Sequence, residues 1–260
     1  MIELVNVNKS FNKRTIISNF SCKFEQGKTN LIIGESGSGK TVLLKCIVGL
    51  TEVDSGQVIY DGRDFIKMNI REKQHIRKEM GMLFQGGALF DSKTVEENVV
   101  FPLSMFTDMG EEEKVERANF CLSRVNLKNV NHLYPSEISG GMKKRVAIAR
   151  AIAPNPKYLF CDEPNSGLDP KTANVIDKLI HEITLEYNMT TVVITHDMNS
   201  VMEIGEKVLF LYKSEKWWEG TQKTVLSTEN KELLDFIYVS KFLKEIREME
   251  TGKKWGSEAK

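Results

Sequence analysis

The chain has little that marks a secreted, membrane-spanning or strongly charged protein. Its 260 residues include 36 basic and 36 acidic side chains, so the formal net charge is zero. Nothing in that balance points to nucleic acid or to an anionic membrane surface. The start of the chain, Met1–Asn6, lacks the basic and apolar regions of a secretion signal. No apolar run approaches the roughly 20 residues that cross a bilayer, so we expect any membrane role to be peripheral.

Cysteine is scarce and scattered. The cysteines form no C-x-x-C pair and no histidine-rich cluster, so the spacing of a metal site is absent. Cysteine usually behaves as a small buried hydrophobe, and we expect reduced, buried thiols, a usage that fits the cytosol. The cysteines are Cys22, Cys46, Cys121 and Cys161. Hydrophobic residues make up 41% of the chain, which is enough to form a core.

One glycine-rich segment matches the pattern G-x-x-x-x-G-K-[ST]. The apolar run Asn30–Ile33 precedes it and a helical pattern over 42–48 follows it, which is the context that a phosphate-binding loop requires. Backbone N–H groups and the helix start would bind phosphates. Lys40 would reach the β- and γ-phosphates, and the Thr41 hydroxyl would face Mg²⁺. Alone, the loop also suits a kinase or a GTPase, and the plain alternative is an accidental glycine-rich turn. The expected nucleotide-binding residues are Gly34, Glu35, Ser36, Gly37, Ser38, Gly39, Lys40 and Thr41.

An acid pair follows the apolar run Tyr158–Cys161. Ligands of open α/β sheets bind at the carboxyl ends of the strands. We therefore expect Asp162 to hold Mg²⁺ through water and to contribute to the nucleotide site. Glu163 is placed to polarise an attacking water as a general base. The alternative is an acid pair that caps a helix after a strand.

The segment Ile138–Met142 reads Ile-Ser-Gly-Gly-Met and resembles the Leu-Ser-Gly-Gly-Gln signature of ATP-binding-cassette (ABC) ATPases. In that family the signature faces the nucleotide of a second protomer. The resemblance implies that Ser139 and Gly141, with Gly140 between them, bind the γ-phosphate in trans, so that one chain alone cannot complete a site. The alternative is a simple helix cap. Met142 departs from the usual glutamine, whose amide hydrogen bonds a thioether cannot replace.

Further residues stand in the order that ABC ATPases show along the chain. Gln85 matches the Q-loop glutamine, which senses Mg²⁺ and moves with the transport partner, and His196 matches the switch histidine at the γ-phosphate. Phe11 occupies the place of the aromatic that stacks on adenine, and residues 165–169 match the D-loop, which crosses the dimer interface. The alternatives are a polar strand end, a structural histidine and a core aromatic. The expected catalytic residues are Glu163, His196 and Gln85, and the expected metal-site residues are Thr41, Gln85 and Asp162.

Strands that alternate with helices predict an α/β fold with a parallel sheet covered on both faces. The resemblance implies a P-loop NTPase (RecA-like) core with an amino-terminal antiparallel β subdomain and a helical signature subdomain. We expect the core in 1–90 and 153–220, the helical subdomain in 91–152 and a helical extension in 221–260. The apolar stripe Leu233–Ile246 of that extension either contacts a partner or folds back. The predicted helices are 63–78, one that begins at Thr94, 111–125, 141–153 and 171–187, and a hairpin is predicted around Trp217.

The segment 82–103 indicates which group of ABC ATPases the chain resembles. It carries Leu-Phe-Gln, then Gly-Ala-Leu-Phe, Asn-Val and Pro-Leu, and is similar to the ATPases of MCE-associated (Mla-type) phospholipid transporters. Ala88, Leu89 and Phe90 are apolar in a loop expected at the surface, which indicates a contact site; the alternative is packing on the helical subdomain. The spacing from Lys40 to Ser139 leaves no room for the coiled-coil insertion of chromosome-organising ABC ATPases.

The resemblance implies an ATP-hydrolysing subunit that uses ATP and Mg²⁺. The implied partners are a second copy, a membrane permease and an MCE-domain lipid-binding protein, without nucleic acid. The implied location is the cytoplasmic side of the inner membrane. Two alternatives stay open: the ATPase of a small-solute importer, for example for an amino acid, and a non-transport regulatory ABC ATPase.

Overall fold

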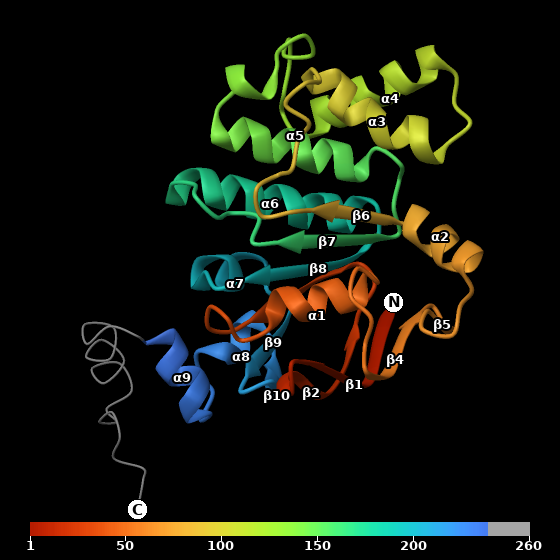
Figure 1. Cartoon of the computed structure of the whole chain (residues 1–260). Helices are drawn as coiled ribbons and strands as arrows, with labels where there is room; N and C mark the ends of the chain where they lie inside the picture. Colours follow the sequence, from red (N-terminus) through yellow and green to blue (C-terminus); the bar gives the residue numbers. More distant parts are fainter. Residues whose placement is uncertain (239–260) are drawn as a thin grey trace, which may run out of the picture.

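The computed structural model describes residues 1–238, which form two sheets and the helices around them (Figure 1). The strands are β1 (Ile2–Phe11), β2 (Arg14–Phe24), β3 (Lys28–Ile33), β4 (Ser55–Tyr60), β5 (Arg63–Asp64), β6 (Met80–Leu83), β7 (Tyr158–Asp162), β8 (Thr190–Thr195), β9 (Lys207–Tyr212) and β10 (Glu215–Gly220). The helices are α1 (Lys40–Ile47), α2 (Ile70–Lys78), α3 (Val95–Phe106), α4 (Glu111–Arg124), the 3₁₀ turn η1 (Pro135–Glu137), α5 (Gly140–Ile152), α6 (Pro170–Glu186), α7 (Met198–Ile204), α8 (Gln222–Val225) and α9 (Lys231–Ile237).

The larger sheet has the strand order β10-β9-β3-β8-β7-β6, and only β10 runs antiparallel to its neighbour among these strands. Its central strands are buried on both faces, and successive side chains enter different cores. In β3, Leu31 and Ile33 join one hydrophobic cluster while Ile32 joins the other. This period-2 division explains why the strand is apolar at every one of these positions.

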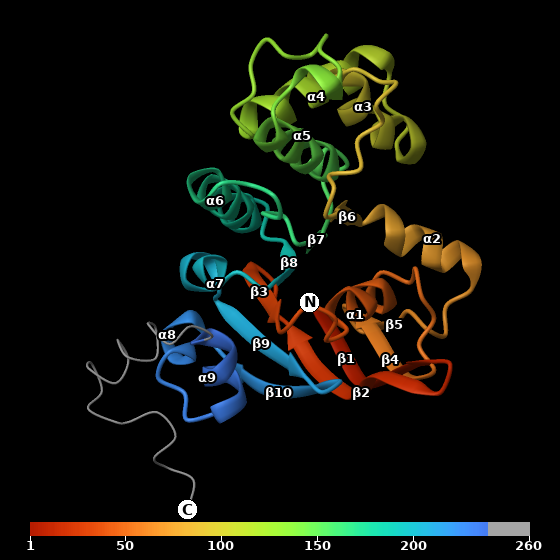
Figure 2. The same cartoon turned by 60° about the vertical axis from the view of Figure 1, so that its left-hand side comes forward.

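Each face of the larger sheet carries a different layer. Figure 2 shows α6, α7 and α8 on one side of β8, β3 and β9, with α1 and the antiparallel sheet on the other. That second sheet has the order β2-β1-β4-β5. The helices α3, α4 and α5 lie together at the top of Figure 1, and α5 packs against β6 and α6. The predicted fold class, a P-loop NTPase cassette with an antiparallel β subdomain and a helical region, is confirmed.

Most predicted helices lie within a residue or two of the observed ones. The helix predicted from Thr94 begins there because the Thr94 hydroxyl accepts from the backbone N–H of Glu97 at 3.2 Å, and the Glu97 carboxylate accepts from the Thr94 N–H at 2.7 Å. The prediction of a helix over 63–78 is wrong in its first half. β5 pairs there with β4, and a capping box between Asn69 and Glu72 starts α2 only at Ile70.

The carboxyl-terminal part of the described chain folds back onto the core. Leu233 is fully buried on α9, and the ring of Phe236 lies 5.4 Å from that of Phe210 on β9. The later part of the predicted apolar stripe, 239–246, lies outside the described residues. The hairpin predicted around Trp217 is present as β9 and β10. No helix within residues 1–238 has both the length and the apolar character needed to cross a membrane.

Candidate functional site

Four loops meet at one edge of the parallel sheet. The phosphate loop follows β3, the acid pair stands at the end of β7, His196 follows β8, and Gln85 lies two residues beyond β6. The register aligns these strand ends, because Ile33 pairs with Thr195, Asp162 with Ile194, and Leu83 with Cys161. Parallel strands present their carboxyl ends together, and ligands bind at this edge in open α/β sheets.

The phosphate loop is closed around its own lysine. Lys40 Nζ donates to the carbonyl oxygens of Gly34 and Glu35, each at 2.8 Å. The Lys40 side chain is almost fully buried, and burial lowers its pKa. Gly39, which immediately precedes α1, has φ +104°, and any Cβ there would lie 2.9 Å from the carbonyl oxygen of Ile16. Only glycine fits this turn and this close approach.

Two features of the loop fit a bound phosphate. The hydroxyl of Ser38 is buried and has no hydrogen-bond partner within residues 1–238, so it is free to bond a ligand oxygen. Among the described residues, the hydrogen bonds of the Lys40 ammonium go to two neutral carbonyl oxygens, so a directly bonded anion would help to offset the cost of its burial.

Two of the three predicted metal-site residues, Thr41 and Asp162, lie in contact in the structure. Thr41 Oγ1 donates to Asp162 Oδ1 at 3.3 Å. Burial raises the pKa of Asp162, although the hydrogen bond from Thr41 opposes the rise. A hydroxyl beside a destabilised carboxylate fits a hard cation such as Mg²⁺, which prefers oxygen ligands. Gln85, the third predicted metal-site residue, contacts Glu163 instead, so the structure joins only two of the three.

Glu163 is held from two sides. Its Oε2 accepts from Gln85 Nε2 at 3.2 Å, and its Oε1 lies 3.0 Å from His196 Nδ1. Its backbone has φ +46°, a strained conformation for a residue with a Cβ, and its N–H donates to the carbonyl of Ile194 at 3.0 Å. The predicted catalytic residues Glu163, His196 and Gln85 therefore form one cluster. Together they can orient a water and accept its proton.

The signature residues lie elsewhere. Ser139 caps α5 by accepting from the N–H of Met142 at 3.2 Å. A pocket beside the helix start is shared by Gly140, Gln85 and the loop 166–168. Among the hydrogen bonds of the described residues, none joins 139–141 to the phosphate loop. One chain thus places its signature beside the Q-loop and D-loop, not over its own phosphate loop.

Lys144 was missed by the sequence analysis. It is buried on the second turn of α5, and its Nζ donates to the backbone oxygen of Gln85 and lies 3.5 Å from Ser166 Oγ. The charged run 143–145 after the signature looks like a solvated helix face, so only the fold shows that this lysine ties α5 to the Q-loop.

Phe11 lies at the tip of the β1–β2 hairpin, where it pairs with Arg14. Its side chain is 45% exposed, so the alternative of a core aromatic is wrong. Ile16, two residues beyond Arg14, packs against Gly39. The strand that follows the hairpin tip thus approaches the phosphate loop at Ile16, and adenine stacking by Phe11 stays a prediction.

The sequence comparison agrees with this geometry. The model of the ABC transporter family matches residues 17–166. The chain belongs to this family. It is an ATP-binding ABC ATPase subunit whose hydrolysis of ATP is coupled to transport, and its cofactors are ATP and Mg²⁺. ABC cassettes dimerise and pair with membrane permeases.

Named relatives of this ABC ATPase fall into two groups. The methionine import ATP-binding protein MetN of Campylobacter jejuni is 37% identical, over 94% of this chain and 78% of its own length. Methionine import proteins of several other bacteria match at 37–40% identity. The intermembrane phospholipid transport system ATP-binding protein MlaF of Haemophilus influenzae is 36% identical, over 91% of this chain and 90% of its own.

The fold of this chain is similar to that of a solved ABC cassette. The ATP-binding cassette MJ0796, a dimer bound to ADP and Pi, is 33% identical and has a TM-score of 0.78. The match covers 85% of this chain and 99% of that cassette.

Proposed function

We propose that two copies of this chain close around two Mg²⁺-ATP molecules and drive a membrane permease from the cytoplasmic side. The proposal depends on two observations. Glu163 is held by Gln85 and His196, and the signature, which lies beside Gln85 and 166–168, makes no hydrogen bond to the phosphate loop among the described residues. A second copy supplies the missing half of each site, and a two-fold arrangement makes both sites alike.

Each residue has a role that its position supports. When ATP binds, Lys40 would exchange the carbonyl oxygens of Gly34 and Glu35 for phosphate oxygens. Thr41 and Asp162 would supply oxygen ligands to Mg²⁺ or to its bound water. Glu163 accepts a proton from the attacking water, and His196 and Gln85 fix the orientation of its carboxylate. In this proposal Ser139 and Gly141 donate to the γ-phosphate on the partner copy, with Gly140 between them, and Phe11 stacks on adenine.

An apolar groove lined by residues on both sides of Gln85 in the sequence supports permease docking. Phe84 and Phe90 are each 40% exposed and Phe101 is 36% exposed, and all three line a pocket with Ala88 and Phe106. The rings of Phe90 and Phe101 lie 4.7 Å apart. Leu89, by contrast, packs partly on the core. Exposed aromatic side chains gathered in one groove are typical of a protein contact, and one of them, Phe84, immediately precedes Gln85 in the sequence.

The first candidate for the transported substrate is a small solute such as an amino acid. Most of the relatives above are methionine import proteins, which favours an importer that also uses a solute-binding protein. The second candidate is phospholipid transport with an MCE-domain partner. The segment 82–103 and the match to MlaF over 90% of its length support this second candidate.

The test is to tag the chain in its native cells, extract membranes in mild detergent and identify the copurifying proteins and lipids. A permease with a solute-binding protein would establish the importer. A permease with an MCE-domain protein and bound phospholipid would establish the lipid transporter. Only non-membrane partners would contradict the transport proposal and favour a regulatory ABC ATPase.

A matched pair of variants tests the docking groove in the same experiment. Phe101→Glu places a charge in the groove and should abolish copurification of the permease. Phe120→Glu changes a similarly exposed ring on α4, outside the groove, and should leave copurification intact. Equal recovery of the permease with both variants would contradict docking at this groove.

A further inference from the structure

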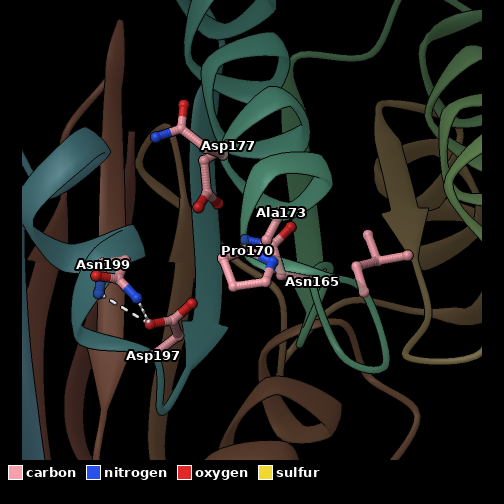
Figure 3. Close-up of a pocket in the computed structure, with 8 residues that line it drawn as sticks. Asn165, Pro170, Ala173, Asp177, Asp197 and Asn199 are labelled. Carbon is pink, nitrogen blue, oxygen red and sulfur yellow. Dashed lines mark hydrogen bonds between the residues drawn. The ribbon is translucent and has the colours of Figure 1, made fainter.

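A polar pocket lies behind the catalytic edge, between residues 165–168, α6 and the start of α7. Figure 3 shows Asp177 reaching into it from α6, with Asn165 and Pro170 on one side and Asp197 and Asn199 on another. Asp177 is only 2% exposed, and its Oδ1 has no hydrogen-bond partner within the described chain; the same holds for the buried Oδ1 of Asn165. Buried polar groups are costly, so their arrangement needs a reason.

A chain of hydrogen bonds crosses this pocket wall. Asn165 Nδ2 donates to Ser200 Oγ at 3.1 Å, and Ser200 Oγ donates to Asp177 Oδ2 at 2.8 Å. Ser200 is 1% exposed. The three residues come from three elements, because Asn165 opens the D-loop, Asp177 lies on α6 and Ser200 lies on α7. Water competes little for such buried bonds, so they hold these elements in register.

Two residues of this hydrogen-bond chain, Asn165 and Ser200, are close in sequence to the catalytic cluster. Asn165 follows Glu163 by two residues, and Ser200 follows His196 by four. Glu163 Oε1 and His196 Nδ1 are 3.0 Å apart, so the two loops touch at the front through these side chains. Behind them, the Asn165–Ser200 bond joins the same two loops. The result is a closed ring of contacts in which Asp177 anchors Ser200 to α6.

We propose that Asp177 and Ser200 are positioning residues for ATP hydrolysis, because their bonds to each other and to Asn165 fix the distance between Glu163 and His196. The proposal rests on the catalytic roles proposed above for those two residues. ATP binding takes place at the phosphate loop, and neither of the two hydrogen bonds among Asn165, Ser200 and Asp177 involves a residue of that loop. Removing these hydrogen bonds should therefore slow the hydrolytic step and leave nucleotide affinity unchanged, since a displaced base loses orientation but not ligand contacts.

The test compares Ser200→Ala and Asp177→Leu with Thr184→Val in the full-length chain. Thr184 is a matched control because it is also buried on α6 and hydrogen-bonded, to the carbonyl of Ile180 and to Thr191. We expect kcat to fall about ten-fold or more in the first two variants, with KM for ATP within about two-fold. The control should lose thermal stability without this fall in kcat.

Conservative variants separate positioning from general destabilisation. Asp177→Asn keeps an oxygen that accepts from Ser200, and Ser200→Thr keeps the hydroxyl, so each should recover most of the lost kcat. Equal kcat in Ser200→Ala, Asp177→Leu and the control would overturn the proposal. So would failure of both conservative variants to recover activity while they remain folded.

Amide hydrogen exchange provides a readout that does not depend on turnover. Ser200→Ala should speed exchange of 163–169 and 196–200 about ten-fold relative to Thr184→Val. The reason is that the two loops lose the hydrogen bond between Asn165 and Ser200. Unchanged exchange there would contradict the proposal. Absence of turnover in the unaltered chain would instead contradict the catalytic roles, and the exchange result would still decide the positioning role.

Discussion

Nδ1 of His196 lies 3.0 Å from Oε1 of Glu163, and the other carboxylate oxygen of Glu163 accepts from Gln85. Three strand ends, those of β6, β7 and β8, thus supply one carboxylate and the two side chains that hold it. A base that is oriented before the reaction loses little entropy when the water arrives. This contact makes Glu163 the centre of the proposed chemistry.

Replacing Glu163 with glutamine keeps the shape of the side chain but removes its capacity to accept a proton. We expect kcat of Glu163→Gln to fall by about 10²–10⁴ while ATP affinity stays the same. ATP-bound protein should then accumulate as a dimer, which light scattering will detect. The control is Glu112→Gln on the exposed face of α4, which should behave as the unaltered chain. Retained turnover in Glu163→Gln would remove this residue as the base.

Lys40→Ala should abolish measurable ATP binding. The ammonium is the only charged donor hydrogen-bonded inside the phosphate loop among the described residues, and hydrogen bonds to charged groups contribute about 1.5–3 kcal/mol each. Titration with a fluorescent ATP analogue checks the loss, and Lys78→Ala on α2 is the control. An unchanged dissociation constant in Lys40→Ala would contradict the assigned role.

Asp177→Asn should change how stability depends on pH. Burial, helped by the nearby Asp197 and Glu203 carboxylates, raises the pKa of Asp177 to about 6, whereas Ser200 and Asn165 oppose the rise. Since the folded state holds this proton more tightly than the unfolded chain, the stability that protonation contributes is present at low pH. It is lost as the pH rises through about 6.

Relative to the unaltered chain, Asp177→Asn should therefore gain unfolding free energy between pH 4.5 and pH 8. The shift in the pKa from 3.8 to about 6 corresponds to about 3 kcal/mol in all, at roughly 1.4 kcal/mol for each pKa unit. About 1 kcal/mol of this is already lost at pH 4.5, so the gain between the two pH values is about 2 kcal/mol. Urea unfolding at the two pH values measures it, and Asp91→Asn at an exposed loop position is the control. The same stability difference at both pH values would show that Asp177 does not titrate in this range.

Local patterns in the sequence predict much of the fold. The phosphate loop, the Thr94 cap and the buried strands depend on neighbouring residues or on a short period, so they can be recognised without long-range contacts. The start of α2 was misjudged because the charged stretch 63–78 reads as helical throughout. Its first residues instead pair with β4 across the two-residue turn Asp61-Gly62, because Tyr60 pairs with Arg63 and Ile59 with Asp64.

The contacts that hold the site together were not predictable in the same way. Gln85 and Glu163 are 78 positions apart, and Lys144 reaches back 59 positions to Gln85. Asn165 and Ser200 are 35 positions apart. Matching of motifs indicates which residue types serve a reaction, but the bonds between them depend on how the strand ends align.

The most direct test of the account is to mix two inactive variants, Lys40→Ala and Ser139→Ala, each confirmed as folded. If each site combines the phosphate loop of one copy with the signature of the other, a mixed dimer holds one intact site and one doubly damaged site. In an equimolar mixture with random pairing and independent sites, half of the dimers are mixed, so ATPase activity should recover to about a quarter of the unaltered level. Activity that stays at the level of the separate variants at every mixing ratio would contradict the composite site.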